Sequence, residues 1–174
     1  FLGASRANSP NLKKPNTPEW EFPGVRAPRP AAASLGLEFT LPEITQTLIL
    51  TRTAGRTPMP SGEDLKDLAA HGASLALYLS AAQAQETGER LAEAYGDDAV
   101  LAICHKVSWP DGRTFFAAPK DLAKTLKENG IDRHALILAS PALTILRSGA
   151  DSPQSKLYDP KFSHGRRQAK KDDR

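Results

Sequence analysis

The stretch Thr47-Leu48-Ile49-Leu50-Thr51 predicts a buried β-strand, because β-branched and aliphatic side chains follow one another without a charged interruption. A loop rich in glycine and proline follows, from Ala54 to Pro60. Ser61 then has the chemistry of a helix N-cap, and apolar residues recur at helical spacing until Gly72. A strand, a loop and a short amphipathic helix in this order predict the beginning of an α/β domain.

The same alternation continues along the chain. Residues 75–79 (Leu-Ala-Leu-Tyr-Leu) predict a second strand. Ser80 and Gln83 have the spacing of a capping box, which predicts a helix that begins at Ser80 and ends at Gly96. Two helix-connected strands indicate a layered α/β architecture with ligand sites near strand ends.

The second half of the chain predicts a mixed sheet. Strands are expected at residues 100–104 and 114–118, and the Trp-Pro-Asp-Gly turn between them makes the two strands antiparallel. A helix over residues 121–129 closes at Gly130, and residues 135–139 (Ala-Leu-Ile-Leu-Ala) form a last apolar strand. The predicted fold class is therefore α/β, with a mixed β-sheet layered with helices.

The two ends of the chain differ from this regular centre. The first 30 residues hold six of the fourteen prolines and show no sustained periodicity. A short helix is expected from Ala31 to Leu35, ended by Gly36, and residues 150–174 again lack a period. Because the chain begins Phe-Leu-Gly-Ala, without methionine or an apolar signal segment, we expect it to start inside a longer gene product.

Charge and composition argue against several classes of function. The net charge of +3 comes from residues 148–174, with seven basic and four acidic residues, whereas the remainder has 16 of each sign. A basic terminus without interleaved aromatic residues is typical of a solvated tail, so no nucleic-acid partner is expected. Apolar runs are far shorter than the roughly 20 residues of a membrane span, so we also expect no membrane association. A single cysteine cannot form an internal disulfide, so we expect a cytoplasmic protein.

Familiar catalytic and metal-binding patterns are not found. The four histidines stand apart in sequence and the single cysteine, Cys104, lies in an apolar run, so no metal site is expected and Cys104 is interpreted as a core residue. Glu63 and Asp64 are adjacent carboxylates near a predicted helix start, where helix capping is a commoner role than acid–base chemistry.

One segment has a specific resemblance. Residues 41–65, Leu-Pro-Glu-Ile-Thr-Gln-Thr-Leu-Ile-Leu-Thr-Arg-Thr-Ala-Gly-Arg-Thr-Pro-Met-Pro-Ser-Gly-Glu-Asp-Leu, closely resemble the segment that opens the second domain of precorrin-4 C(11)-methyltransferases, in the tetrapyrrole methylase family. Further matches follow in order at residues 77–80, 108–111, 135–143, 157–160 and 162–165, and residues 23–25 with 31–36 resemble the family's interdomain crossover.

The resemblance implies a two-domain homodimeric enzyme of cobalamin biosynthesis. Such an enzyme binds S-adenosylmethionine between its domains and transfers the methyl group to carbon 11 of precorrin-4 or cobalt-precorrin-4. The glycine- and proline-rich loop and the Gly-Asp motif of the family's first domain do not occur in this chain. We therefore expect residues 1–36 to be a remnant of the first domain with the crossover, residues 37–147 the second domain, and residues 148–174 a loosely ordered basic tail. The alternative is a non-catalytic remnant or dimerisation domain.

By position, the resemblance also implies a set of site residues. The cofactor-binding residues would be Tyr78, Leu79 and Ser80, Val107 and Ser108, Ser140, Pro141 and Ala142, and at the crossover Val25, Arg26 and Ala27. The carboxylate-rich tetrapyrrole would be anchored by Arg52 and Arg56, which bracket the glycine- and proline-rich loop. The family usually has serines where Arg26 and Ala27 stand, and no residue is identified as a general base.

Overall fold

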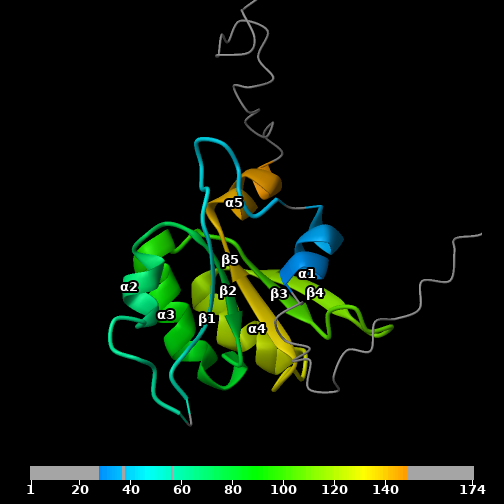
Figure 1. The fold of residues 1–174 in the computed structure, drawn as a ribbon. Helices are drawn as coiled ribbons and strands as arrows, with labels where there is room; N and C mark the ends of the chain where they lie inside the picture. The colour runs from blue at the N-terminus through cyan, green and yellow to red at the C-terminus, as the bar shows by residue number, and fades with distance from the viewer. Residues whose placement is uncertain (1–27, 37, 56, 149–174) are drawn as a thin grey trace, which may run out of the picture.

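A computed structural model of the chain describes residues 28–36, 38–55 and 57–148. They form one five-stranded sheet in the order β1-β2-β5-β3-β4, with helices on both faces (Figure 1). The strands are β1 (Leu48–Arg52), β2 (Ser74–Tyr78), β3 (Leu101–His105), β4 (Arg113–Ala117) and β5 (Ala135–Ala139). The helices are α1 (Pro28–Leu35), α2 (Leu65–Ala69), α3 (Ala84–Tyr95), α4 (Leu122–Glu128) and α5 (Pro141–Ser148), with 3-10 turns η2 (Ala81–Gln83) and η3 (Pro119–Asp121). The predicted mixed α/β fold is confirmed.

The strand directions define two ends of the sheet. β1 and β2 are parallel, and β5 lies antiparallel between β2 and β3. The carboxyl ends of β1, β2 and β3 therefore meet at one end of the sheet, which we call the first end; there His105 pairs with Ala135. The carboxyl end of β5 lies at the opposite, second end, where Ala139 pairs with Leu75 and Leu101.

Each face of the sheet has its own apolar core. Alternate side chains of β5 point to opposite faces, so Ile137 joins one buried cluster and Leu138 joins the other. The first cluster is completed by α2, α3 and α4, and the second by α1 and α5 (Figure 1). Cys104 is a buried member of the second cluster, as predicted for a core residue.

The helices among the described residues are all too short or too polar to span a bilayer.

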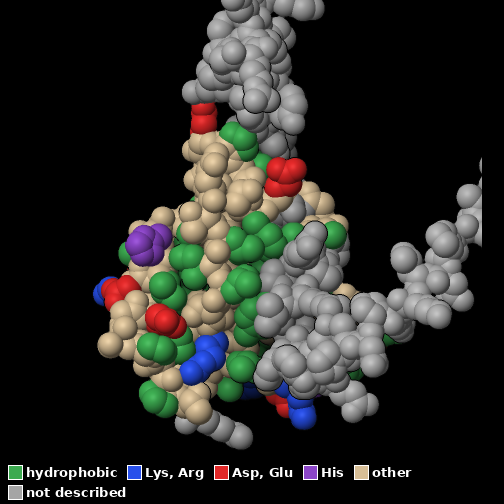
Figure 2. All heavy atoms as spheres, viewed as in Figure 1, with side chains coloured by type: hydrophobic (Ala, Val, Ile, Leu, Met, Phe, Trp, Pro, Cys, Tyr) green, Lys and Arg blue, Asp and Glu red, His purple; other side chains and the backbone are tan. Residues whose placement is uncertain are grey.

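The predicted strands agree closely with the observed ones, but β1 is less buried than expected. β5 has the predicted bounds, and the other four strands begin and end within one residue of the prediction. The prediction that the Thr47–Thr51 run is buried was wrong, because β1 is an outer strand of the sheet that the described residues form. Leu50 is 47% exposed, and apolar side chains lie on both sides of the β1 backbone in Figure 2.

Two predicted helix caps were also wrong. Ser61 does not cap α2; Asp64 does, which confirms the capping role expected for that carboxylate: it accepts a hydrogen bond from the Lys66 amide at 2.9 Å and pairs with Arg90. The predicted capping box of Ser80 and Gln83 does not form, because the Ser80 hydroxyl bonds elsewhere and a 3-10 turn precedes α3. Side-chain spacing therefore located these helices but misassigned the residues that begin them.

Helix α5 was not predicted. The sequence nevertheless contains a helix-start signal, because serine is a good N-cap and proline suits the first helical position. In the structure the Ser140 hydroxyl accepts a hydrogen bond from the Ala142 amide at 3.1 Å, and Pro141 is the first residue of α5. At the other end of the described chain, α1 begins at Pro28, three residues before the predicted Ala31, and ends before Gly36 as predicted. The predicted tail after Ser148 lies outside the described residues.

We expect Ile137→Ala to lower the free energy of unfolding by about 2–5 kcal/mol, because Ile137 is fully buried in the central strand. Leu50→Ala is the matched control on an outer strand, and we expect it to change the free energy by less than about 1 kcal/mol. Urea melts of the two variants measure the difference. Equal effects would contradict the strand order.

We expect Asp64→Ala to destabilise the protein by about 1 kcal/mol, the usual value of a helix N-cap. Ser61→Ala, at the position predicted from sequence, should have almost no effect. The hydrogen bond from the Lys66 amide and the Arg90 side chain lower the pKa of Asp64 below its usual range. The Asp64 contribution is therefore present at neutral pH and lost as the pH falls through that lowered value, so the two proteins should converge below about pH 4 in urea melts.

Candidate functional site

A cavity of about 490 Å³ lies at the first end of the sheet, and we call it the strand-end cavity. Its walls come from the residues that follow β2 and β3 and from those that precede β5. They are Tyr78, Leu79, Ala81, Ala82, Cys104, Lys106, Val107, Trp109, Asp132, Arg133, His134, Ala135 and Leu136. Cavities of this size at strand ends are the usual location of small-molecule sites in α/β sheets.

Backbone strain is concentrated around the strand-end cavity. Of the five described non-glycine residues with positive φ, Leu79 (52°), Lys106 (51°) and His134 (55°) line the cavity, and Ser108 (69°) lies between two lining residues. A β-carbon is disfavoured in this left-handed region, so the surrounding structure must impose the conformation. Such residues cluster at ligand-binding sites, which makes this cavity the leading candidate.

The cavity combines exposed apolar surface with an unsatisfied polar group. Leu79 is 81% exposed, the largest value among the exposed large hydrophobic residues of the described chain. The Tyr78 hydroxyl is buried without a hydrogen-bond partner, and burial raises the pKa of Tyr78, so the phenol is protonated at neutral pH. Burial also raises the pKa of the Cys104 thiol, which fits a core residue rather than a nucleophile.

Charged groups at the rim of the cavity are already paired. Lys106 forms an ion pair with Asp111, and its ammonium lies 5.7 Å from the centre of the Trp109 ring. Arg133 pairs with the adjacent Asp132 at 3.0 Å. The rim therefore has little net charge, so shape and apolar contact dominate its recognition.

The structure brings together two of the three predicted cofactor-binding strand ends. Tyr78, Leu79 and Val107 line the strand-end cavity, and Ser108 lies beside it. Ser80 links the end of β2 to the residue that follows β1. Its hydroxyl donates to the Tyr78 carbonyl at 2.7 Å and accepts from the Thr53 amide at 3.1 Å.

The third predicted strand end lies elsewhere. Because β5 is antiparallel to β2, residues 140–142 lie at the second end of the sheet, away from Leu79. The Ser140 hydroxyl forms a 2.6 Å hydrogen bond with the Ser74 hydroxyl at the start of β2. Ser140 and Pro141 line a separate cavity of about 420 Å³.

Arg52, a predicted substrate anchor, is engaged with its own loop. Its guanidinium donates hydrogen bonds to the carbonyl groups of Thr53 and Thr57, both at 3.2 Å, and of Pro58 at 2.9 Å. These bonds use three of the five guanidinium N–H donors, so two remain for a ligand. Arg56 and the crossover residues Val25, Arg26 and Ala27 lie outside the described residues.

Several lining residues were not predicted from sequence, notably Trp109 and His134. Their rings stack with centres 5.6 Å apart and planes tilted by 32°. The Trp-Pro-Asp-Gly turn was recognised only as a turn, although a tryptophan in a polar, glycine-containing loop is itself a signal for an exposed binding surface.

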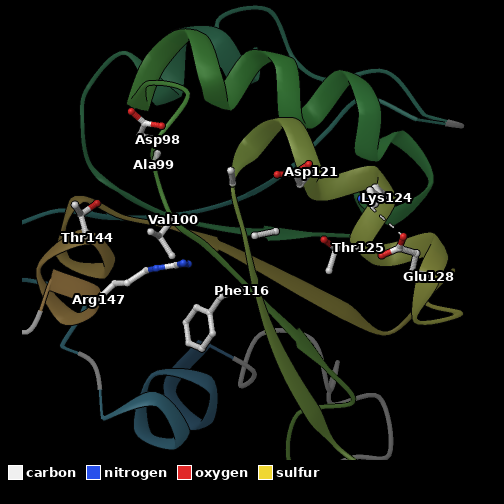
Figure 3. Close-up of a pocket in the computed structure, with 12 residues that line it drawn as sticks. Asp98, Ala99, Val100, Phe116, Asp121, Lys124, Thr125, Glu128, Thr144 and Arg147 are labelled. Atoms are coloured by element: carbon white, nitrogen blue, oxygen red, sulfur yellow. Dashed lines mark ion pairs between the residues drawn. The ribbon is translucent and has the colours of Figure 1, made fainter.

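A larger cavity of about 680 Å³ lies at the second end of the sheet, between β4, α4 and α5. Figure 3 shows Arg147 reaching from α5 toward Phe116, with Lys124 and Glu128 across the cavity on α4. Lys124 and Glu128 lie 4.0 Å apart. None of the strained non-glycine residues and none of the predicted site residues line it.

Among the described residues no histidine, cysteine or carboxylate cluster is arranged to hold a metal ion.

Comparison with known proteins agrees with this fold. The family model of the tetrapyrrole (corrin/porphyrin) methylases matches residues 20–123, more than half of the chain. The chain therefore belongs to the tetrapyrrole methylase family.

Within the family, the chain is similar to precorrin-4 C(11)-methyltransferases. It is 42% identical to the precorrin-4 C(11)-methyltransferase of Pseudomonas aeruginosa, over 94% of this chain and 64% of that protein. It is 41% identical to the cobalt-precorrin-4 C(11)-methyltransferase of Priestia megaterium, over 86% of this chain and 58% of that protein. The chain thus spans about three fifths of the length of these relatives.

Two solved structures of methyltransferases also superimpose on this chain. The X-ray structure of a cobalt precorrin-4 methyltransferase, a cobalamin biosynthetic enzyme, superimposes with a TM-score of 0.63 at 40% identity, covering 66% of this chain and 48% of that chain. The uroporphyrin-III C-methyl transferase of Thermus thermophilus, solved with S-adenyl homocysteine, has a TM-score of 0.51 at 15% identity, covering 66% of this chain and 50% of that chain. The second likeness supports the fold alone.

We expect Arg52→Leu to loosen the loop of residues 53–60, because three loop carbonyls lose their common donor. Amide hydrogen exchange of Gly55, which donates to the Thr57 carbonyl, should become faster. Arg113→Leu is the control, because Arg113 also lies at a strand end but donates no hydrogen bond to a loop carbonyl among the described residues. Unchanged exchange in the Arg52 variant would show that the loop keeps its shape without the guanidinium.

Proposed function

We propose that this chain supplies the second-domain part of an S-adenosylmethionine-dependent methyltransferase that acts on carbon 11 of precorrin-4 or cobalt-precorrin-4. The observation that carries the proposal is the coincidence of two independent features at the first end of the sheet. The strand-end cavity gathers the strained backbone of Leu79, Lys106, Ser108 and His134. Leu79, Val107 and Ser108 are also positions where the family resemblance implies cofactor contacts.

The residues present fit the adenosyl part of the cofactor. An apolar wall with Leu79, Ala81 and Ala82 suits a planar base, and backbone N–H and C=O groups at the ends of β2 and β3 suit its polar edge. The cofactor, when bound, supplies an activated methyl group on a sulfonium. The residues of this chain then contribute orientation and exclusion of water, because displacement at that methyl depends mainly on alignment.

For the tetrapyrrole substrate we propose Arg52 and Arg56 as contacts at the loop. Arg52 offers its two remaining N–H donors to a substrate carboxylate while its other donors hold the loop. In this role Arg52 anchors and positions, and it takes no part in proton transfer.

We further propose the division of the chain into residues 1–36, 37–147 and 148–174, a cytoplasmic location and a homodimeric assembly. Residues 140–142 lie at the second end of the sheet. We propose that they contact the cofactor only if another part of the assembled enzyme binds the cofactor at that end. Because the chain spans about three fifths of its relatives, a non-catalytic or assembly role for this chain alone is the second candidate.

We expect the isolated chain to bind S-adenosylhomocysteine about a hundredfold more weakly than a full-length relative, because loss of even three hydrogen bonds at about 1 kcal/mol each gives this factor. Calorimetric titration measures it. Leu79→Asp should abolish the remaining affinity, since a charge replaces apolar cavity wall, whereas Leu50→Asp, at an exposed leucine outside the cavity, should leave it unchanged.

Equal losses in the two leucine variants would contradict the proposed site. Micromolar affinity of the unmodified chain would contradict the second candidate, since it would show that this chain alone forms a sufficient cofactor site. Methyl transfer to precorrin-4 is expected only when the missing portion of the enzyme is supplied.

A further inference from the structure

Trp109 is the most exposed aromatic side chain of the strand-end cavity. It lines the cavity and remains 55% exposed although the His134 ring and the Lys106 ammonium both lie against it. Exposed tryptophan is unfavourable unless the ring serves a contact, because its large apolar surface is left in water.

The loop that carries Trp109 is held firmly in one shape. The Lys106 amide donates to the His134 carbonyl at 2.9 Å, the Trp109 amide to the Lys106 carbonyl at 3.0 Å, and the Gly112 amide to the Trp109 carbonyl at 3.0 Å. A β-carbon at Gly112 would lie 2.6 Å from the Lys106 carbonyl oxygen and 3.0 Å from that of Trp109, so only glycine closes this turn. The tryptophan ring is therefore presented in a fixed position before any ligand arrives.

The surroundings of Trp109 determine which ligand suits it. The Lys106 ammonium over the ring is neutralised by Asp111, and Arg133, which also lines the cavity, is neutralised by Asp132, so a strongly charged ring would gain little. Apolar walls favour a flat ring, whereas the polar lining residues Lys106, Asp132 and Arg133 favour a ring with polar atoms at its edge. These requirements together describe an uncharged planar heteroaromatic ring of the purine type.

We propose that Trp109 is a platform on which the purine ring of a nucleoside ligand stacks, and that it determines the preference of the cavity for such a ring. The proposal rests on the proposed function in that the ligand would be the adenosyl part of the methyl donor. It adds Trp109, a residue that the resemblance does not name, to the proposed cofactor site.

Trp109 provides its own spectroscopic signal. The chain has two tryptophans, so Trp20→Phe leaves Trp109 as the single indole emitter. Titration of this variant with S-adenosylhomocysteine, and separately with adenosine, should quench the emission in a saturable way. In calorimetry, Trp109→Leu should weaken binding by about two- to tenfold, the range expected for one aromatic stacking contact, and Trp109→Phe by less. Phe116→Leu, at an aromatic residue of similar exposure outside the cavity, is the matched control and should change nothing.

The outcomes separate the platform from the methyl-donor assignment. Saturable binding of S-adenosylhomocysteine with unchanged Trp109 emission, and with equal affinity in Trp109→Leu, would overturn the platform and leave the proposed function intact. Quenching by adenosine without any binding of S-adenosylhomocysteine would support the platform and contradict the methyl-donor assignment. Failure of both probes to change the emission at millimolar concentration would overturn the platform directly.

Discussion

The antiparallel insertion of β5 between β2 and β3 is the constraint on which the rest of the structure depends. It closes the sheet through two sets of backbone pairs, and its alternating side chains supply both apolar cores. It also fixes what meets at each end of the sheet. The residues before β5 join the carboxyl ends of β2 and β3 and complete the strand-end cavity, whereas the residues after β5 lie at the far end.

Much of the fold could be predicted from sequence because its strands have strong local signals. Aliphatic runs located four of the five strands and the aromatic run around Phe115 the fifth, and glycines with positive φ marked the ends of α1 and α2. Strand order and burial were beyond local reasoning. The Thr47–Thr51 run reads like a buried strand, but tertiary pairing placed it at an outer position, which no local pattern specifies. The start of α2 was ambiguous for a similar reason: Ser61 and Asp64 have the same capping chemistry, and only the structure shows that Asp64 is the cap.

The candidate site was predictable only in part. The resemblance pointed to the ends of β2 and β3, and those residues do line one cavity. It also grouped residues 140–142 with them, which the reversed direction of β5 prevents within this chain. Arg52 was interpreted from its charge and its loop position, yet three of its donors serve neighbouring carbonyls. The contact between the Trp109 and His134 rings forms only in the tertiary structure, so the sequence could not predict it.

The outer position of β1 and β4 has a consequence for the behaviour of this chain in concentrated solution. Within the part of the chain that the structure describes, no strand pairs with the outer edge of either, so each presents a row of N–H and C=O groups onto which another polypeptide can add. Short aliphatic segments such as Leu48–Arg52 are the kind that nucleate intermolecular β-structure. Both strands carry one arginine at an end, Arg52 and Arg113, and like charges brought together would oppose such growth.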